Sequence, residues 1–438
     1  MDSPKVPKDI RLPEAFERRM KDTLQGDFGK FKESLDAEPS VSVRVNHLKH
    51  SSLAGKPVLW CPAGLYLPER PIFTLDPNFH AGAYYVQEAS SMFLEQAVRA
   101  SVDLSKPLRV LDLCAAPGGK STHLLQLINN ESLLISNEVI RSRAAILSEN
   151  IQKWGKANVI VTNNDPKDFT SLTGLFDLVV VDAPCSGEGL FRKDEAAMDE
   201  WSEENVHLCA LRQRRILSDV WPSLKENGVL IYCTCTYNEA ENEDNIEWFS
   251  KQKDVEVIDI PSFPGIQKTI GYRFMPHKIN GEGFFIAAVR KKSKEYPARL
   301  KPLALKSSKN EPGWLKGNFN YYEINDLLIA VTTDEIPNLN IVTRGVAVAT
   351  IMRNKLVPEH ALALSVDIEK DAFPVIDADR NMALKYLSKE TIAATDDERG
   401  FALIRYDGNN LGFVNRLGNR INNLYPANWR IRMNINRP

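Results

Sequence analysis

Between residues 107 and 290 the sequence repeats one pattern, in which a short apolar run is followed by a loop and then by an amphipathic stretch. The apolar runs have the length of strands: LRVLDL, SLLISN, NVIVT, FDLVVVDA, GVLIYCT and GEGFFIAAVR. The stretches with helical periodicity are KSTHLLQLI, RSRAAILSENIQKWG and EENVHLCALRQRRILSDVW. Strands that alternate with helices and are apolar throughout predict an α/β fold, a doubly wound, Rossmann-like parallel sheet covered by helices on both faces.

The regions on either side of this pattern predict smaller units. The N-terminal part mixes the helical stretch PEAFERRMKDTL with the alternating strand SVSVRVN, which predicts a small α+β domain over 1–100. The sheet domain is expected to occupy 101–292. A basic, proline-containing stretch follows, so 293–375 is predicted to be a linker and an intermediate domain. Short strands separated by Asp-Gly and Asn-Asn turns predict a β-rich module over 376–438.

The charge and the cysteines of the chain argue against a secreted or membrane-spanning protein and favour a polyanion partner. The chain has six cysteines without paired spacing, no secretion signal and no apolar run that could span a membrane, so we expect a cytoplasmic monomer with free thiols. Its net charge is only −2, but residues 290–310 carry eight Lys or Arg and one Glu, and the last thirty residues carry five Arg and no acid. Basic patches on a neutral chain favour a polyanion partner such as RNA. A solvated linker and a basic tail are the alternative.

The loop after the first predicted strand indicates a cofactor site. It reads CAAPGGK, which is neither G-x-G-x-x-G nor a complete phosphate-binding loop, and this weakens nicotinamide and nucleoside triphosphate binding. Glu138 closes the second strand about twenty residues later, where a carboxylate suits a ribose diol, and Asp165 follows the third strand, where it could face an adenine amino group or merely end a turn. This combination predicts S-adenosylmethionine as the cofactor.

Two cysteines indicate the reaction. Cys185 follows the fourth strand and Cys235 follows the fifth, so both are expected at one edge of the sheet. C5 of cytosine becomes nucleophilic when a thiolate adds to C6, and a second group must then help the thiolate to leave. Cys233 is expected to pack within its strand, and Cys61 and Cys209 are expected to be buried structural thiols. The spacing of these cysteines predicts no metal site.

Several motifs together resemble one family. LDLCAAPGGKSTHL, NEVIRSR, DAPCSGEGLFRKD, QRRIL and YCTCTYNEAEN, preceded by VRVN and YYVQEASSMF, are similar to the RNA cytosine-5 methyltransferases of the Sun/NSUN type. The likeness covers residues 40–290 densely. The stretch RYDGNNLGFVNRLGNRINNLYPANWRI resembles the PUA-like tail of the members that act on bacterial 16S ribosomal RNA. We therefore expect both the N-terminal domain, 1–100, and the PUA-like module, 376–438, to bind RNA.

The resemblance implies the roles of individual residues. Cys235 would attack the base, Cys185 would assist release of the product, Asp182 would contact the cytosine or the cofactor, and Lys120 would point into the site. The cofactor would be held by the following residues: Cys114, Ala115, Ala116, Pro117, Gly118, Gly119, Lys120, Glu138, Arg143, Asp165 and Asp182.

The substrate is expected to be RNA with an accessible base, within 16S ribosomal RNA or the small ribosomal subunit. In the C-terminal module Phe413, Tyr425 and Trp429 lie among arginines, which predicts base stacking, with a small aromatic core as the alternative. A tRNA substrate, a nicotinamide-dependent oxidoreductase and a catalytically inactive RNA-binding protein are the competing functions. The inactive protein would need none of Cys235, Cys185 and Asp182.

Overall fold

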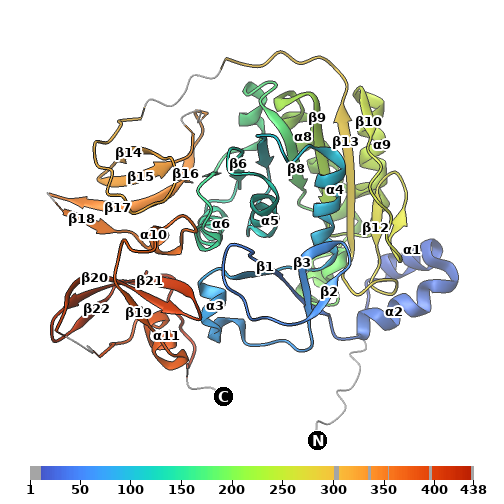
Figure 1. The fold of residues 1–438 in the computed structure, drawn as a ribbon. Coiled ribbons are helices and arrows are strands. Elements are labelled where there is room, and N and C mark those ends of the chain that lie inside the picture. Colours follow the sequence, from blue (N-terminus) through green and yellow to red (C-terminus); the bar gives the residue numbers. More distant parts are fainter. Residues whose placement is uncertain (1–10, 300–304, 334–336, 354, 394–396, 436–438) are drawn as a thin grey trace, which may run out of the picture.

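The chain is built around a ten-stranded sheet (Figure 1), with the strand order β11-β12-β13-β9-β8-β5-β6-β7-β16 and β10 beside β13. The computed structural model describes residues 11–299, 305–333, 337–353, 355–393 and 397–435. The parallel strands are β5 (Arg109–Asp112), β6 (Leu133–Asn137), β7 (Val159–Thr162), β8 (Phe176–Asp182) and β9 (Leu224–Thr234). The antiparallel strands are β10 (Val255–Val257), β11 (Gln267–Lys268), β12 (Tyr272–Phe274), β13 (Phe284–Lys291) and β16 (Ile341–Arg344).

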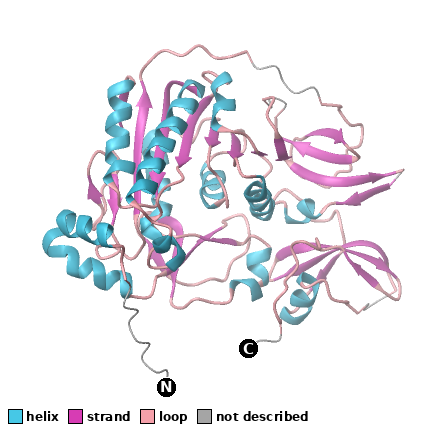
Figure 2. Ribbon diagram, turned by 180° about the vertical axis from the view of Figure 1, so that it is seen from behind, coloured by secondary structure: helices cyan, strands magenta, loops and turns pink. Residues whose placement is uncertain are grey.

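Helices cover both faces of this sheet, as the apolar strands predict (Figure 2). One face packs against α4 (Leu94–Ser101), α5 (Gly119–Leu127) and α6 (Arg141–Trp154). The other face packs against the 3-10 helix η4 (Pro166–Ser171), α8 (Glu203–Val220) and α9 (Glu243–Gln252). Alternate strand residues therefore enter different cores: Val180 contributes to the first and Val181 to the second. The predicted doubly wound fold is confirmed.

The strand order places a crevice at a defined point of the sheet. From β5 the chain runs outward through β6 and β7 on one side, and it then returns to β8 and β9 on the other side. Ligands of doubly wound sheets bind where the order reverses, beyond the carboxyl ends of the strands. In this chain that point lies between β5 and β8.

The N-terminal part joins helices to a second sheet. The helices are α1 (Glu14–Leu24), α2 (Phe28–Asp36) and the short α3 (Pro77–His80), and the sheet has the order β2-β3-β1-β4. Its strands are β1 (Val41–Val45), β2 (Lys56–Val58), β3 (Cys61–Leu67) and β4 (Tyr84–Val86). The short 3-10 helices of the chain are η1 (Gln25–Asp27), η2 (Phe73–Leu75), η3 (Ser90–Phe93), η5 (Glu188–Leu190), η6 (Trp221–Ser223) and η7 (Glu239–Glu241). Phe16 and Phe31 pack on Phe191 and Tyr237, so α1 and α2 cover the loops that follow β8 and β9.

Arg44 of β1 fixes this N-terminal part to the central domain. Its guanidinium is fully buried, lies over the Trp154 ring at 4.5 Å and donates to Thr122 Oγ1 at 2.6 Å and to Gln87 Oε1 at 2.8 Å. A buried charge is tolerated when its hydrogen bonds are satisfied, and here the partners come from β1's own domain and from α5.

The C-terminal third forms two small sheets. The first has the order β14-β15-β17-β18, from β14 (Asn320–Ile324), β15 (Leu327–Val331), β17 (Val346–Met352) and β18 (Lys355–Pro358). The second has the order β19-β20-β21-β22, from β19 (Val375–Asp377), β20 (Arg399–Tyr406), β21 (Asn409–Leu417) and β22 (Ile421–Asn423). The remaining helices are α7 (Glu195–Asp199), α10 (His360–Leu364) and α11 (Arg380–Leu387). The stretch predicted as linker and intermediate domain thus contains a folded sheet, and its strand β16 pairs with β7 of the central sheet.

The expected base stacking on Phe413 and Tyr425 is wrong, because both rings are buried in the cores of the C-terminal modules, as the aromatic-core alternative predicts. Trp429 is half-buried against His360, and its stacking on a base stays a prediction. In the basic stretch, the Lys291 ammonium is buried and donates to the Trp221 and Leu224 carbonyls. Lys301 and Arg437, which also belong to the basic patches, lie outside the described residues. Within the described ranges, every helix is too short or too polar to cross a membrane.

Candidate active site

The loop after β5 is shaped by glycine and closed by a buried acid. Gly118 caps α5 with φ of +115°, a left-handed conformation that L side chains rarely adopt. Asp112, the last residue of β5, accepts from Ser121 Oγ at 2.6 Å, while its second oxygen has no partner among the described residues. Burial raises the pKa of Asp112 to about 7. The loop backbone and an unsatisfied acidic oxygen therefore border the crevice.

The predicted cofactor residues of this loop differ in exposure. Three residues of the loop are buried, namely Ala115, Ala116 and Gly118, whereas Pro117 is exposed. Cys114 packs against the second core, and burial raises the pKa of its thiol. The thiol of Cys114 thus has a packing role, and its contact with the cofactor stays a prediction.

Glu138 and Arg143 meet at the end of β6. Glu138 Oε1 accepts from the Ile140 N–H at 3.0 Å, and its Oε2 lies 3.6 Å from an Arg143 nitrogen. Arg143 also donates to the Ala116 carbonyl at 2.8 Å. Arg143 therefore ties the glycine-rich loop to the acid that was predicted to face a ribose, and the ribose contact itself stays a prediction.

Asp165 has the contacts of a capping residue. Its side chain accepts from the Lys167 N–H and caps η4 in a reciprocal arrangement with Asp168. Its carboxylate also lies 3.8 Å from Arg215. The turn alternative explains these contacts, and an adenine contact of Asp165 stays a prediction.

Lys120 and Asp182 form an ion pair across the switch point. Lys120 Nζ lies 2.8 Å from Asp182 Oδ2 and 5.2 Å from the centre of the Phe284 ring. Burial by itself would lower the pKa of Lys120, but Asp182 outweighs that effect and the pKa lies above its ordinary value. The lysine therefore carries a proton in the crevice, next to the carboxylate that ends β8.

The two predicted thiols lie together. Cys185 Sγ is 3.3 Å from Cys235 Sγ, both side chains are partly exposed, and neither is in a disulfide. The hydrogen bond with Cys235, followed by burial, raises the pKa of Cys185 well above that of an ordinary thiol. Because two thiolates at this separation repel each other strongly, the pair holds one shared proton in its singly charged state.

Gly189 permits this approach of the two loops. Its N–H donates to the Cys235 carbonyl at 2.9 Å. A Cβ at Gly189 would lie 2.6 Å from the Gly283 oxygen and 2.8 Å from the Cys235 oxygen, which are backbone atoms that cannot rotate away. The sequence motif S-G-E-G thus contains a glycine required by close backbone approach.

Gly189→Ala is therefore expected to separate the loops. We expect the free energy of unfolding in urea to fall by about 1–3 kcal/mol through overpacking, and diamide to form the Cys185–Cys235 disulfide more slowly than in the unaltered protein. Gly29→Ala is the matched control, since nothing lies within 4 Å of a Cβ there. Equal disulfide formation in the Gly189 and Gly29 variants would show that the glycine does not set the distance between the sulfurs.

Three buried residues that the sequence alone did not single out surround the thiols. Glu241 of η7 binds Ser186, the neighbour of Cys185, and Gln213 of α8 binds both Glu241 and the Pro184 carbonyl. Glu188 is also buried, and it accepts from Arg19 of α1 at 2.7 Å and from Trp201. All three lie in motifs that carry the family resemblance, Glu188 in DAPCSGEGLFRKD, Gln213 in QRRIL and Glu241 in YCTCTYNEAEN, but the sequence assigned no role to the individual side chains.

The other cysteines lie away from the sulfur pair. Cys233 is buried, with Sγ 3.7 Å from Asp182 Oδ1, which agrees with a packing role. Cys61 is buried beside His123, whose Nε2 lies 3.2 Å from Glu95 Oε2. These last three side chains come from β3, α4 and α5, so they form a polar junction between the N-terminal part and the central domain.

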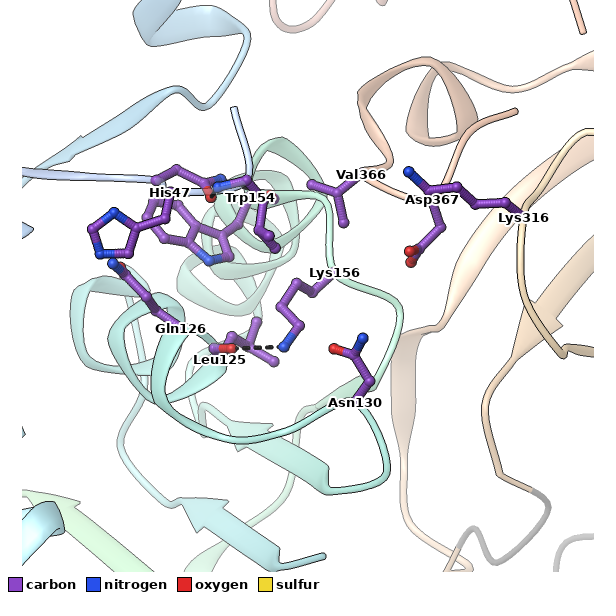
Figure 3. A pocket seen from close by; sticks show the side chains of 11 residues that line it. His47, Leu125, Gln126, Asn130, Trp154, Lys156, Lys316, Val366 and Asp367 are labelled. Atoms are coloured by element: carbon purple, nitrogen blue, oxygen red, sulfur yellow. Dashed lines mark hydrogen bonds between the residues drawn. The ribbon is translucent and has the colours of Figure 1, made fainter. Parts of the chain in front are cut away.

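A separate cavity of about 300 Å³ lies at the opposite end of α5 (Figure 3). Figure 3 shows Lys156 donating to the Leu125 carbonyl, with Lys316 and Asp367 reaching in from the C-terminal third. The glycine-rich loop precedes α5, whereas this cavity borders its last turn, about 13 Å further along a helix of this length. The cavity is therefore distinct from the crevice that holds the thiols.

Three family models match successive parts of the chain. The model for 16S rRNA methyltransferase RsmB/F matches residues 101–290, the model for the N-terminal domain of 16S rRNA methyltransferase RsmF matches 12–89, and the model for the methyltransferase RsmF PUA domain matches 373–431. The last match agrees with the predicted PUA-like module, and a methyltransferase family does not support the nicotinamide-dependent alternative.

Individual relatives agree with these matches. A methyltransferase homolog protein from Pyrococcus horikoshii has a solved structure that aligns with a TM-score of 0.57 at 27% identity, over 66% of this chain and 99% of that one. Ribosomal RNA small subunit methyltransferase F of Escherichia coli O157:H7 is 34% identical over 308 residues, which is 64% of each chain. The protein of the same name from Shewanella loihica is 30% identical over 431 residues, which is 88% of each chain. With that identity over most of both chains, this protein belongs to the family of ribosomal RNA small subunit methyltransferase F.

Proposed function

We propose that this protein transfers a methyl group from S-adenosylmethionine to C5 of a cytidine in 16S ribosomal RNA. The observation that carries the proposal is the 3.3 Å separation of Cys185 and Cys235 beside the glycine-rich loop of a methyltransferase sheet. The family description names 16S rRNA, and this favours ribosomal RNA over tRNA.

The crevice has the groups that S-adenosylmethionine requires. Gly118 and Gly119 let the loop backbone approach a ligand, Glu138 is suited to the ribose hydroxyls, and Arg143 keeps the loop and Glu138 together. Val139 and Ile140, which follow Glu138, are exposed apolar side chains of the kind that a purine ring would cover. When bound, the cofactor supplies an electrophilic methyl group on a sulfonium. The remaining residues proposed to hold it are Cys114, Ala115, Ala116, Pro117, Lys120, Asp165 and Asp182.

The side chains around the thiols would act on the base in sequence. Cys235 adds to C6 as a thiolate, which makes C5 an enamine carbon and therefore a nucleophile. The Lys120–Asp182 pair lies at the neighbouring strand end and offers a proton or a hydrogen bond at N3, which absorbs the charge formed during addition. After methylation a base accepts the C5 proton and passes it to solvent, the C5–C6 double bond re-forms, and Cys235 leaves C6 as a thiolate. We assign assistance in this release to Cys185.

The base must leave its stack to reach Cys235, so we propose a substrate region in which the cytidine is unpaired or easily extruded. The small ribosomal subunit, or its RNA alone, is the proposed partner. We further propose that the protein acts as a monomer in the cytoplasm, consistent with its free thiols.

The proposal predicts one or more cytidines of 16S rRNA whose methylation depends on this protein. Bisulfite sequencing of ribosomal RNA and tRNA from a deletion strain is expected to reveal cytidines in 16S rRNA that convert to uridine only when the gene is absent. Complementation with the unaltered gene should restore protection, whereas the Cys235→Ala gene should not. Loss of protection in tRNA alone would instead establish the tRNA alternative.

A further inference from the structure

We propose that Glu241 is a positioning residue that holds the Cys185 loop against Cys235 and keeps the shared proton of the thiol pair on Cys185. The proposal rests on the function inferred above for the two thiols. It concerns the division of labour between them: Cys235 would be the thiolate, and Cys185 would be the thiol that donates to it.

The contacts of Glu241 reach the residue next to Cys185. Glu241 Oε2 accepts from the Ser186 N–H at 2.9 Å, and Oε1 accepts from the Ser186 hydroxyl in a short hydrogen bond. That hydroxyl also lies 3.0 Å from the Thr236 hydroxyl, on the residue that follows Cys235. One carboxylate thereby connects the two loops immediately beside both sulfurs.

Gln213 of α8 adds two hydrogen bonds to those of Glu241, and we call this set of hydrogen bonds around the Cys185 loop the clamp. Its amide donates to Glu241 Oε2 at 2.9 Å and to the Pro184 carbonyl at 3.0 Å. The amide cannot present its oxygen to Glu241, because Asn245 donates to that oxygen at 2.7 Å. Burial raises the pKa of Glu241, but every group that faces its carboxylate acts as a donor, or can do so, and these hydrogen bonds favour the ionised acid.

The negative charge of Glu241 affects Cys185 more than it affects Cys235. It is bonded to the chain on both sides of Cys185, through Pro184 by way of Gln213 and through Ser186 directly, and it raises the pKa of Cys185. A second anion at Cys185 would face this buried charge, so the proton stays there and the charge of the pair settles on Cys235.

Other polar groups near Glu241 do not reverse this bias. The Tyr232 hydroxyl donates to the Glu241 backbone carbonyl at 2.6 Å, and Cys209 of α8 is a buried thiol whose pKa is raised by burial. Glu188 is neutralised by its ion pair with Arg19. No cation is paired with the Glu241 carboxylate among the described residues, so its charge acts on Cys185 without a counter-ion.

The test is a site-resolved alkylation of the free protein. Iodoacetamide reacts with thiolates, and peptide mass spectrometry after limited reaction gives the ratio of modification at Cys235 to that at Cys185. In the unaltered protein Cys235 is expected to react first. In Glu241→Gln, which keeps the shape and removes the charge, the ratio is expected to fall by about tenfold, the change that one pKa unit produces.

Glu243→Gln is the matched control. Glu243 lies two residues further on, is also buried, and binds Arg273 and Thr269 instead of the cysteine loops. Its loss is expected to weaken the fold without changing the alkylation ratio. A purely structural role of Glu241 would make the two variants alike, and an unchanged ratio in a folded Glu241→Gln protein overturns the proposal.

A second variant keeps the test decisive if Glu241→Gln does not fold. Ser186→Ala removes the hydroxyl that joins Glu241 to Thr236 but retains the backbone N–H. The ratio is expected to shift in the same direction, and an unchanged ratio in the folded variant also contradicts the proposal. Since alkylation needs neither RNA nor cofactor, normal methylation by the unaltered protein together with an unmoved ratio refutes the clamp alone. A shifted ratio without any methylation of RNA refutes only the proposed function.

Discussion

Cys235→Ala is expected to abolish methyl transfer to RNA, lowering the rate by about 10⁴-fold or more, which corresponds to about 5 kcal/mol of barrier. Without a sulfur at this position no covalent bond forms at C6, and C5 of the ring keeps its low nucleophilicity. The measurement is incorporation of labelled methyl groups from S-adenosylmethionine into 16S rRNA. Cofactor binding, followed by calorimetry, is expected to change little because Cys235 lies beyond the end of β9.

Cys209→Ala is the control for this variant, since it also removes one thiol but from α8, where Sγ lies 3.9 Å from Asn205 Oδ1 in the same helix. Its methylation rate should stay close to that of the unaltered protein. If Cys235→Ala retained substantial activity while Cys185→Ala lost all of it, the roles assigned to the two sulfurs would have to be exchanged.

Cys185→Ala is expected to trap the protein on its RNA as an adduct that survives denaturing electrophoresis. The first methyl transfer should proceed, because Cys235 is intact, but the bond to C6 should persist when the neighbouring thiol 3.3 Å away is missing. We expect most of the protein to accumulate as adduct after one turnover, with little adduct in the unaltered protein.

The double variant Cys185→Ala, Cys235→Ala distinguishes this adduct from adventitious crosslinking, since it lacks the attacking sulfur and should migrate free of RNA. Normal turnover by Cys185→Ala without any adduct would mean that another group assists release. The partial exposure of Cys185 leaves room for a water molecule in that role.

The sheet could be predicted from the sequence because its signal is local. Each strand from LRVLDL to GEGFFIAAVR is a short apolar run between amphipathic stretches, and burial on two faces leaves little choice of architecture. The convergence of Cys185 and Cys235 followed from the same logic, since residues just beyond adjacent parallel strands share one edge. Lys120 and Asp182 were brought together for the same reason.

The residues that sequence analysis missed depend on contacts between distant segments. Gln213 on α8 resembles any polar residue of an amphipathic helix, and only packing of α8 against η7 makes it a partner of Glu241. Arg44 alternates with valines as a solvent-facing residue would, yet the cover supplied by α5 and α6 buries it. Phe413 and Tyr425 show the converse error, because a small module must use its aromatic rings to make a core.

The pairing of β16 with β7 has a consequence for how the protein may be divided. Residues 341–344 form the edge strand of the methyltransferase sheet beside β7, although the forty-nine residues 292–340 separate them from β13, the preceding strand of this sheet in the sequence. A fragment that ended at residue 290, the last residue matched by the methyltransferase family model, would lack β16. The backbone N–H and C=O groups of β7 that pair with β16 would then be unpaired and could pair with another copy of the fragment. The C-terminal third therefore completes the methyltransferase sheet, in addition to containing the terminal module.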